Sequence, residues 1–177
     1  MKKHPESQRG VTLIEVAVAM TIVAVGVSTA GPGFQDLVSR KRLEGIAAQL
    51  ATDLQYVRTE AVARNEPVRI SFHAGPGGSC YVIHTGARAQ CACGGPVPAV
   101  CSGDAVQIKT VYLGSAQQVG VAASANSILF DPLHGTSTPT GTARVTGPQG
   151  AIHHVVNVMG RVRSCSPAGA LPGYRTC

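Results

Sequence analysis

An unbroken run of apolar residues lies near the amino terminus, and its length suits a membrane-spanning helix. Between Val11 and Gly31 the only charged residue is Glu15. A helix of about 20 residues spans roughly 30 Å, which is the thickness of the hydrocarbon core of a bilayer. Because a charge in that core costs at least ~2.5–3.5 kcal/mol, Glu15 is predicted to be a functional residue with a partner.

The pattern after Gly31-Pro32 is that of an amphipathic helix. Apolar residues recur at steps of three and four, which places them on one helix face. These residues are Leu43, Ile46, Leu50, Leu54, Val57 and Ala61. Pro32 lacks an amide hydrogen, so it is predicted to kink a helix that otherwise continues from the membrane. Asn65-Glu66-Pro67 is predicted to end it, since the residue before proline avoids helical angles.

From Val68 onward the residues are typical of strands separated by turns rich in glycine and proline. The predicted strands are Val68–His73, Cys80–Thr85, Val106–Tyr112, Ser127–Phe130, Thr142–Thr146 and His154–Met159. Strands at this spacing with one long helix favour an α+β fold, in which the amphipathic half of the helix packs on an antiparallel sheet. With 4% aromatic residues and no Trp, the core is expected to consist of Val, Ile, Leu and Ala.

The short segment before the apolar run is basic and ends in glycine, at Arg9-Gly10. Cleavage after Gly10 would give Val11 a free amine about one helical turn from Glu15. The same amine on a neighbouring subunit could neutralise that carboxylate within lipid. The pattern therefore predicts an assembly device, with residues 1–10 as a leader, 11–31 as a transmembrane helix, 32–66 as an amphipathic helix and 67–177 as an exported domain.

The motif Gly10-Val11-Thr12-Leu13-Ile14-Glu15 resembles the leader site of the type IV pilin and pseudopilin family, although Val11 replaces the usual Phe. The resemblance implies cleavage by a prepilin peptidase and methylation of the Val11 amine. It also implies a single-pass inner-membrane protein with a periplasmic carboxyl-terminal domain. That protein then joins other pilin or pseudopilin subunits in a filament at the cell surface.

An ordinary secretory signal peptide is the alternative interpretation of the same segment. Lys2, Lys3 and Arg9 would form its basic region, and Ser28-Thr29-Ala30 would be its cleavage site. Glu15 interrupts the apolar run, however, and the run is longer than the 7–15 residues that signal peptides need. Amino-terminal sequencing distinguishes the two, because a mature chain that starts at Gly31 contradicts the pilin interpretation.

Two further segments resemble the branch of the family that contains the GspH pseudopilins and the FimT minor pilins. The first is Leu54–Arg64 with the strand that follows it, and the second is Ile128-Leu129-Phe130-Asp131-Pro132 with Gly135. The Cys-rich stretch from Ser79 to Ser102 matches no pattern in that branch. The resemblance leaves two functions open: a FimT-like minor pilin of a type IV pilus, or a GspH-like minor pseudopilin of a type II secretion system.

The exported part is basic. From Pro67 to the end it has seven Lys and Arg against two acids, Asp104 and Asp131. Such a balance suits a polyanionic partner or an anionic envelope surface, and it also suits solubility alone. Net charge by itself does not decide between them.

Gly160-Arg161-Val162-Arg163 is the most informative motif within the exported part. Arginines spaced i, i+2 in an extended segment project to the same side, about 6–7 Å apart, where both could bind backbone phosphates. The motif resembles the G-R-x-R element of FimT-type minor pilins, which implies binding of double-stranded DNA without sequence specificity during natural transformation. Arg144, Arg175 and Lys109 are predicted neighbours of this pair. The alternative is that the arginines only solvate the end of a strand.

All six cysteines lie in the exported part, which indicates an oxidising compartment and a set of disulfides. They are Cys80, Cys91, Cys93, Cys101, Cys165 and Cys177. The predicted pairs are Cys165–Cys177, Cys80–Cys91 and Cys93–Cys101, although sequence alone does not choose among the 15 connectivities.

Metal binding and catalysis are not predicted. Cys91-Ala92-Cys93 lacks the spacing of a zinc knuckle, and His153 and His154 would face opposite sides of a strand. Asp131 and His134 form an acid–imidazole pair without a nucleophile, and the glycine-rich turn at residues 75–78 lacks the lysine of a phosphate loop. We expect no cofactor and no enzymatic activity.

Overall fold

The computed structural model describes residues 10–167 and 171–177, and for residues 29–32 it describes the backbone only. The predicted leader up to residue 9 and the side chain of Pro32, with its predicted kink, lie outside the described part. The chain divides into two compact units, Met1–Val38 and Ser39–Cys177. The single long helix α1 (Leu13–Arg64) contributes to both units.

In the first unit, the described side chains from Val11 to Val27 are exposed, including Leu13, Ile14 and Met20. Among the described residues, no single helix is long and apolar enough to cross a membrane alone. The helical parts Leu13–Ser28 and Gly33–Arg64 meet the length and composition requirement only as a bent pair.

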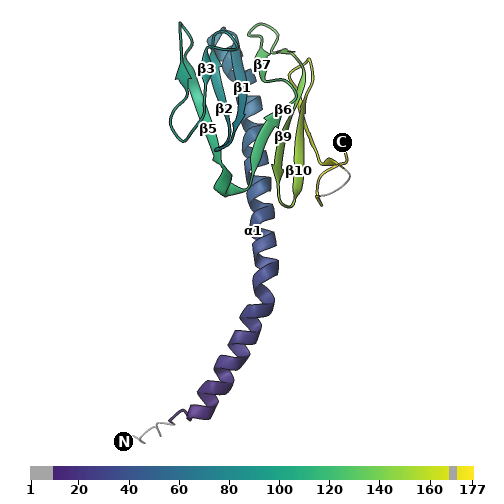
Figure 1. Ribbon diagram of the computed structural model, residues 1–177. Helices are drawn as coiled ribbons and strands as arrows, with labels where there is room; N and C mark the ends of the chain where they lie inside the picture. Colours follow the sequence, from purple (N-terminus) through teal and green to yellow (C-terminus); the bar gives the residue numbers. More distant parts are fainter. Residues whose placement is uncertain (1–9, 168–170) are drawn as a thin grey trace, which may run out of the picture. The chain divides into compact units, whose positions relative to one another are not determined.

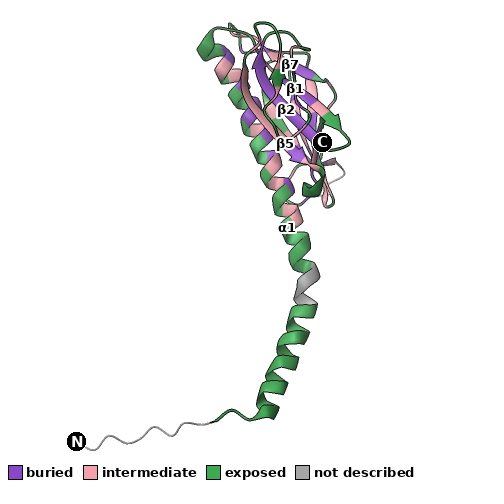
Figure 2. Cartoon of the chain, turned by 60° about the vertical axis from the view of Figure 1, so that its left-hand side comes forward, coloured by how far each residue is buried: buried purple, intermediate pink, exposed green. Residues whose placement is uncertain are grey.

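In the second unit, one face of α1 forms the centre of the core. The fully buried positions recur at steps of four and three, and they are Leu43, Ala47, Leu50, Leu54, Val57 and Ala61 (Figure 2). Five of the six predicted core positions are therefore correct. Ile46 is only partly buried, and Ala47 takes its place.

The helix ends at Arg64 through a backbone cap. Asn65 adopts the left-handed conformation at φ 52°, the Glu66 amide donates to the Ala61 carbonyl at 3.2 Å, and the Asn65 amide donates to the Val62 carbonyl at 3.2 Å. This pattern is a Schellman motif with asparagine in the usual place of glycine. Pro67 follows and cannot continue the helix, as the sequence predicted.

Eleven strands are present in the described residues. They are β1 (Val68–Gly75), β2 (Gly78–Thr85), β3 (Cys91–Ala92), β4 (Val100–Cys101), β5 (Gln107–Gly114), β6 (Gly120–Ala123), β7 (Ser127–Phe130), β8 (Ser137–Thr138), β9 (Gly141–Gly147), β10 (Gly150–Val156) and β11 (Val162–Cys165). A short 3₁₀ helix, η1 (Ser115–Gln117), precedes β6. Five of the predicted strands match an observed one closely, whereas the predicted strand His154–Met159 is displaced because the chain turns after Val156.

The strands form two main antiparallel sheets instead of one. The first has the order β5-β2-β1-β7-β8 and the second has the order β11-β10-β9-β6, while β3 and β4 pair separately. Both main sheets pack against the carboxyl-terminal part of α1 (Figure 1). The chain therefore has the α+β pilin-like architecture that the sequence predicted.

A buried carboxylate ties the helix to the first sheet. Asp53 on α1 accepts hydrogen bonds from Tyr81 Oη of β2 at 2.7 Å and from Lys109 Nζ of β5 at 2.6 Å. Burial, and then the hydrogen bond to Asp53, raise the pKa of the Tyr81 phenol. Lys109 is therefore engaged with Asp53 in the first sheet, and its predicted place beside the arginines of the second sheet is wrong.

Candidate functional site

The predicted arginines meet on the outer face of the second sheet. Arg144 on β9 pairs with His153 of β10, and Arg163 on β11 pairs with Val155 of the same strand. His153 and Val155 are two residues apart, so all four side chains project to one side of the sheet. Arg161 lies two residues before Arg163, and alternation along the extended chain places it on the same side.

These residues form a surface that we call the arginine face, made of Arg144, Arg161 and Arg163 with His153 and Val155 between them. All three arginines are exposed. The four strands β6, β9, β10 and β11 contain no Asp or Glu. The face therefore presents positive charge that no carboxylate from its own strands neutralises.

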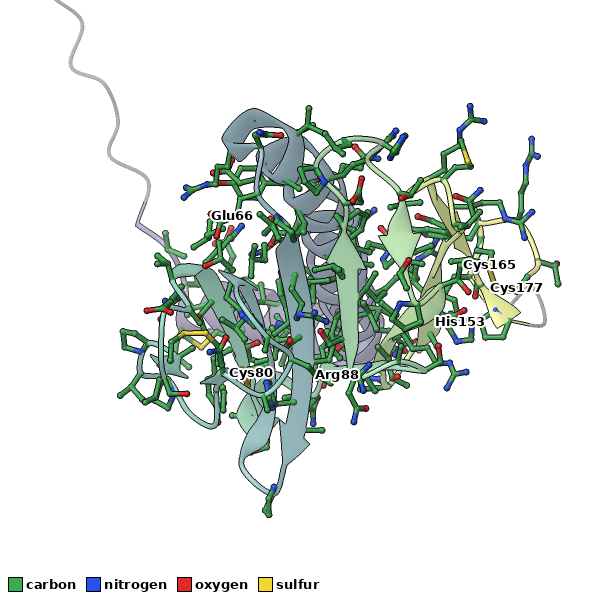
Figure 3. All side chains as sticks on the ribbon, turned by 90° about the horizontal axis from the view of Figure 1, so that it is seen from above. Glu66, Cys80, Arg88, His153, Cys165 and Cys177 are labelled. Carbon is green, nitrogen blue, oxygen red and sulfur yellow. A yellow bond between two sulfur atoms is a disulfide. The ribbon has the colours of Figure 1, made fainter. Side chains whose placement is uncertain are left out.

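The carboxyl-terminal tail is fastened beside the arginine face. Cys165 at the end of β11 forms a disulfide with Cys177, as predicted, and Cys177 Sγ lies 3.7 Å from His153 Nδ1 (Figure 3). The Ser166 amide donates to the Arg175 carbonyl at 2.9 Å, which holds the backbone of Arg175 against the end of β11. Burial, and then the charge of Arg144, lower the pKa of His153.

The other two disulfides differ from the predicted pairs. Cys80 is bonded to Cys93, and Cys91 is bonded to Cys101. The reason is the small β3–β4 sheet, whose register places Cys91 directly opposite Cys101. Cys93 then packs with Cys80 and Val82 of β2, so the Cys-rich loop covers the side of the first sheet that faces away from α1. No cysteine is free, so no thiolate is left as a metal ligand.

The two adjacent histidines of β10 face opposite sides of the sheet. His153 lies on the arginine face, whereas His154 is fully buried and its Nδ1 makes a 2.9 Å hydrogen bond with Ser164 Oγ. Among the described residues, no group of three His, Cys, Asp or Glu could hold a metal ion. Asp131 and His134 lie 3.3 Å apart, but the carboxylate accepts the amides of Leu133 and His134 and so stabilises a turn.

His154 makes stability depend on pH. Burial lowers its pKa to about 4, so between pH 6.5 and 4 the unfolded chain binds a proton that the folded chain does not. The contribution of neutral His154 to the free energy of unfolding is therefore fully present above pH 6.5. About 3 kcal/mol of that free energy is lost as the pH falls to 4. Denaturant unfolding across this range should show that loss, and His154→Leu should reduce it while His153→Asn retains it. Equal pH dependence in both variants would contradict the assignment.

In the first unit, Glu15 lies in the first turn of α1. Its amide donates to the Thr12 carbonyl at 3.1 Å and approaches Thr12 Oγ1 at 3.4 Å. Thr12 and Glu15 thus have the spacing of a capping box, which the sequence interpretation missed although the T-x-x-E signal was present. Val11 and Glu15 also line one shallow hollow along the helix, so the two residues share a face.

Sequence reasoning also missed Arg58, because its partner is 77 positions away in the chain. Arg58 Nε on α1 donates to the Gly135 carbonyl at 3.1 Å. Gly135 in turn contacts Gly160, directly before Arg161. Arg58 therefore supports the turn from which the arginine pair begins.

The helix, the disulfide-bonded β-domain and the glutamate at the start of an apolar helical segment define a pilin-like subunit. A family model described as "Type II transport protein GspH" matches residues 47–160, and one described as "Prokaryotic N-terminal methylation motif" matches residues 7–31. The chain belongs to the GspH family of pilins and pseudopilins.

A solved structure has the same fold. The type IV minor pilin FimU of Pseudomonas aeruginosa PAO1 is similar, with a TM-score of 0.52 at 19% identity, over 75% of this chain and 97% of FimU. A second crystal form of FimU gives a TM-score of 0.49 at 17% identity, over 72% of this chain and 99% of FimU. No curated protein matches in sequence. The chain is thus a subunit of the kind that builds type IV pili or type II secretion filaments with other pilins.

Proposed function

We propose that this chain is a FimT-like minor pilin of a type IV pilus that binds double-stranded DNA through the arginine face. The observation that carries the proposal is the position of Arg144, Arg161 and Arg163 on one exposed face of strands without carboxylates. Guanidinium groups arranged in this way bind phosphates without reading the base sequence.

The tail extends the same surface. Because Cys165–Cys177 and the bond from Ser166 to Arg175 hold the end of the chain beside β11, Arg175 adds a fourth exposed cation next to the end of that strand. A phosphate backbone lying across β11, β10 and β9 would thus meet cations along its path. Non-specific affinity for DNA arises mainly from such contacts and from the counterions that they release.

The amino-terminal segment would bring this surface into the filament in the following way. A prepilin peptidase removes residues 1–10 by cutting between Gly10 and Val11, and the new amine of Val11 is methylated. Residues 11–31 then hold the subunit in the inner membrane, with residues 32–66 as the amphipathic helix and 67–177 as the periplasmic domain. Glu15 pairs with the amino terminus of an adjacent subunit when the filament forms.

A minor pseudopilin of a type II secretion system is the second candidate, and the GspH family match over residues 47–160 favours it. In that role the arginine face would only solvate the domain. A deletion strain separates the two functions. Loss of DNA uptake with normal protein secretion supports the first, and the reverse result supports the second.

Replacing both Arg161 and Arg163 by alanine should weaken DNA binding. We expect a fall of at least tenfold in duplex affinity for the full chain in detergent, and a log-affinity against log-salt slope smaller by about two. Fluorescence anisotropy over a salt series measures both. Arg88→Ala is the control for loss of a cation outside the arginine face, because Arg88 is exposed but lies on the Cys-rich loop of the other sheet. Unchanged affinity and slope in the double variant would remove DNA binding from the function.

A further inference from the structure

The hairpin that joins β10 to β11 is closed by a tight network of hydrogen bonds. The Asn157 amide donates to the Arg161 carbonyl at 3.1 Å, the Gly160 amide donates to the Asn157 carbonyl at 2.9 Å, and the Arg161 amide donates to Asn157 Oδ1 at 2.9 Å. Gly160 has φ +68°. This is the pattern of a three-residue loop whose last position needs a left-handed glycine.

The turn between β7 and β8, residues 131–136, and the first residue of β8 lie against this hairpin and brace it. The Ser137 amide donates to the Val158 carbonyl at 2.9 Å, and Ser137 Oγ donates to the Asn157 carbonyl at 2.6 Å. Gly160 lies against the carbonyl of Gly135, which also accepts from Arg58. The hairpin is therefore fixed by contacts from β8 and α1 as well as by its own hydrogen bonds.

The residues at the end of this fixed hairpin are apolar and exposed. Val158 and Met159 are 56% and 54% exposed, and Leu133 of the bracing turn is 76% exposed. Turn positions usually carry Asn, Asp, Ser, Gly or Pro, because these residues favour turn angles and remain hydrated. Val158 and Met159 are not part of the core, so folding does not account for them. We call Leu133, Val158 and Met159 the apolar tip.

A shallow groove of about 510 Å³ leads from the apolar tip along the second sheet. Its lining includes Val158 of the apolar tip and Val155, which pairs with Arg163 on the arginine face. The remaining lining is mostly small hydroxyl and amide residues, namely Ser124, Thr140, Thr142 and Asn157. None of the lining residues is charged.

We propose that the apolar tip and this groove bind unstacked bases of a DNA strand whose phosphates bind the arginine face. The inference rests on the proposed DNA-binding function and adds a preference to it: duplex binds through its phosphates alone, and DNA with unpaired or unstacked bases binds more tightly. Leu and Met side chains are among those that proteins insert at base steps, and any base offers an apolar face to them. Hydroxyl and amide groups along the groove can form hydrogen bonds with base edges, whereas an acyl chain has no group that could form such bonds.

The test compares a single strand with a duplex of equal length and composition, both binding to the full chain in detergent. We expect the single strand to bind about tenfold more tightly. Val158→Ser with Met159→Ser should remove most of that preference, and neither change threatens the fold, because both side chains are exposed. Fluorescence of 2-aminopurine in the single strand should rise with the wild type and stay lower with the variant.

Val97→Ser with Val100→Ser is the matched control, because these two valines are also exposed but lie on the Cys-rich loop. This control should keep the full preference. Equal binding of both probes by the wild type, or an unchanged preference in the tip variant, overturns the inference while leaving duplex binding intact. If neither probe binds, the proposed DNA-binding function fails as well. Anionic phospholipid added as mixed micelles would assign the tip to lipid and overturn the inference if it competed through the tip but not through the arginines.

Discussion

Replacing Glu15 by glutamine should lower incorporation of this subunit into filaments to the background level. The proposed role of Glu15 is to offer a negative charge to the amino terminus of an adjacent subunit inside an apolar environment. Glutamine has nearly the same size and hydrogen-bonding reach but no charge. Loss of an ion pair in a medium of low dielectric leaves the partner amine unpaired, which costs several kcal/mol per subunit.

Glutamine is the informative replacement because Thr12 and Glu15 also have the spacing of a capping box at the start of α1, where Thr12 Oγ1 accepts from the Glu15 amide. Either Glu or Gln serves in a capping box. If Glu15 only capped the helix, Glu15→Gln would assemble normally. If its charge matters, the variant should fail to assemble while it still inserts into the membrane, since removal of a charge favours insertion.

Two measurements separate these outcomes. Membrane fractionation should show the variant at or above the wild-type level, and immunoblots of sheared filaments should show none of it. Glu15→Asp keeps the charge on a shorter side chain and tests whether the length of the side chain matters. Normal amounts of Glu15→Gln in filaments would contradict the assembly role given to this residue.

The helix and most strands were predictable because their signals are local. Steps of three and four identify the buried face of α1, and Asn65-Glu66-Pro67 contains both the left-handed position and the residue that blocks continuation. Ala47 was not distinguished from Ile46, since both lie close to the apolar face and only packing against the sheets decides which is buried.

Signals that depend on register were not predictable. The pairing of Cys91 with Cys101 follows from a two-residue strand pair that leaves no periodic pattern in the sequence. Likewise, the mostly apolar residues of His154–Met159 suggested a strand that continues to Met159. The Asn157 side chain and the left-handed Gly160 turn the chain instead. Such features depend on contacts that only the folded chain makes.

The arginine face was predictable in part. The i, i+2 spacing of Arg161 and Arg163 is enough to predict that both side chains project to the same side. The position of Arg144 beside them depends on its pairing with His153 between β9 and β10, which the sequence does not reveal. Lys109 was misplaced because charge alone says nothing about the buried partner Asp53 in the other sheet. The apolar tip was overlooked because Val158 and Met159 were assigned to a strand, where apolar residues are expected.

Gly160→Ala should destabilise the domain and weaken DNA binding together. Alanine at φ +68° carries a conformational cost of about 1–2 kcal/mol, and its Cβ would collide with the backbone oxygen of Gly135. Relief requires the hairpin to move away from the turn that braces it, so we expect a total cost of roughly 2–4 kcal/mol. The melting temperature should fall by roughly 5–15 °C, and duplex affinity should fall because Arg161 directly follows the displaced residue.

Gly173→Ala is the matched control for that change. Gly173 also has a positive φ, at +95°, but apart from its chain neighbours no atom of the described residues lies within 4 Å of the position that its Cβ would occupy. The Gly173→Ala variant should therefore lose only the free energy that the backbone conformation costs alanine, about 1 kcal/mol, and it should retain DNA affinity. Thermal unfolding and anisotropy on the two variants isolate the contact with Gly135. If Gly160→Ala loses no more stability than Gly173→Ala, the hairpin is not held against the Gly135 turn, and the fixed presentation of the arginine pair is wrong.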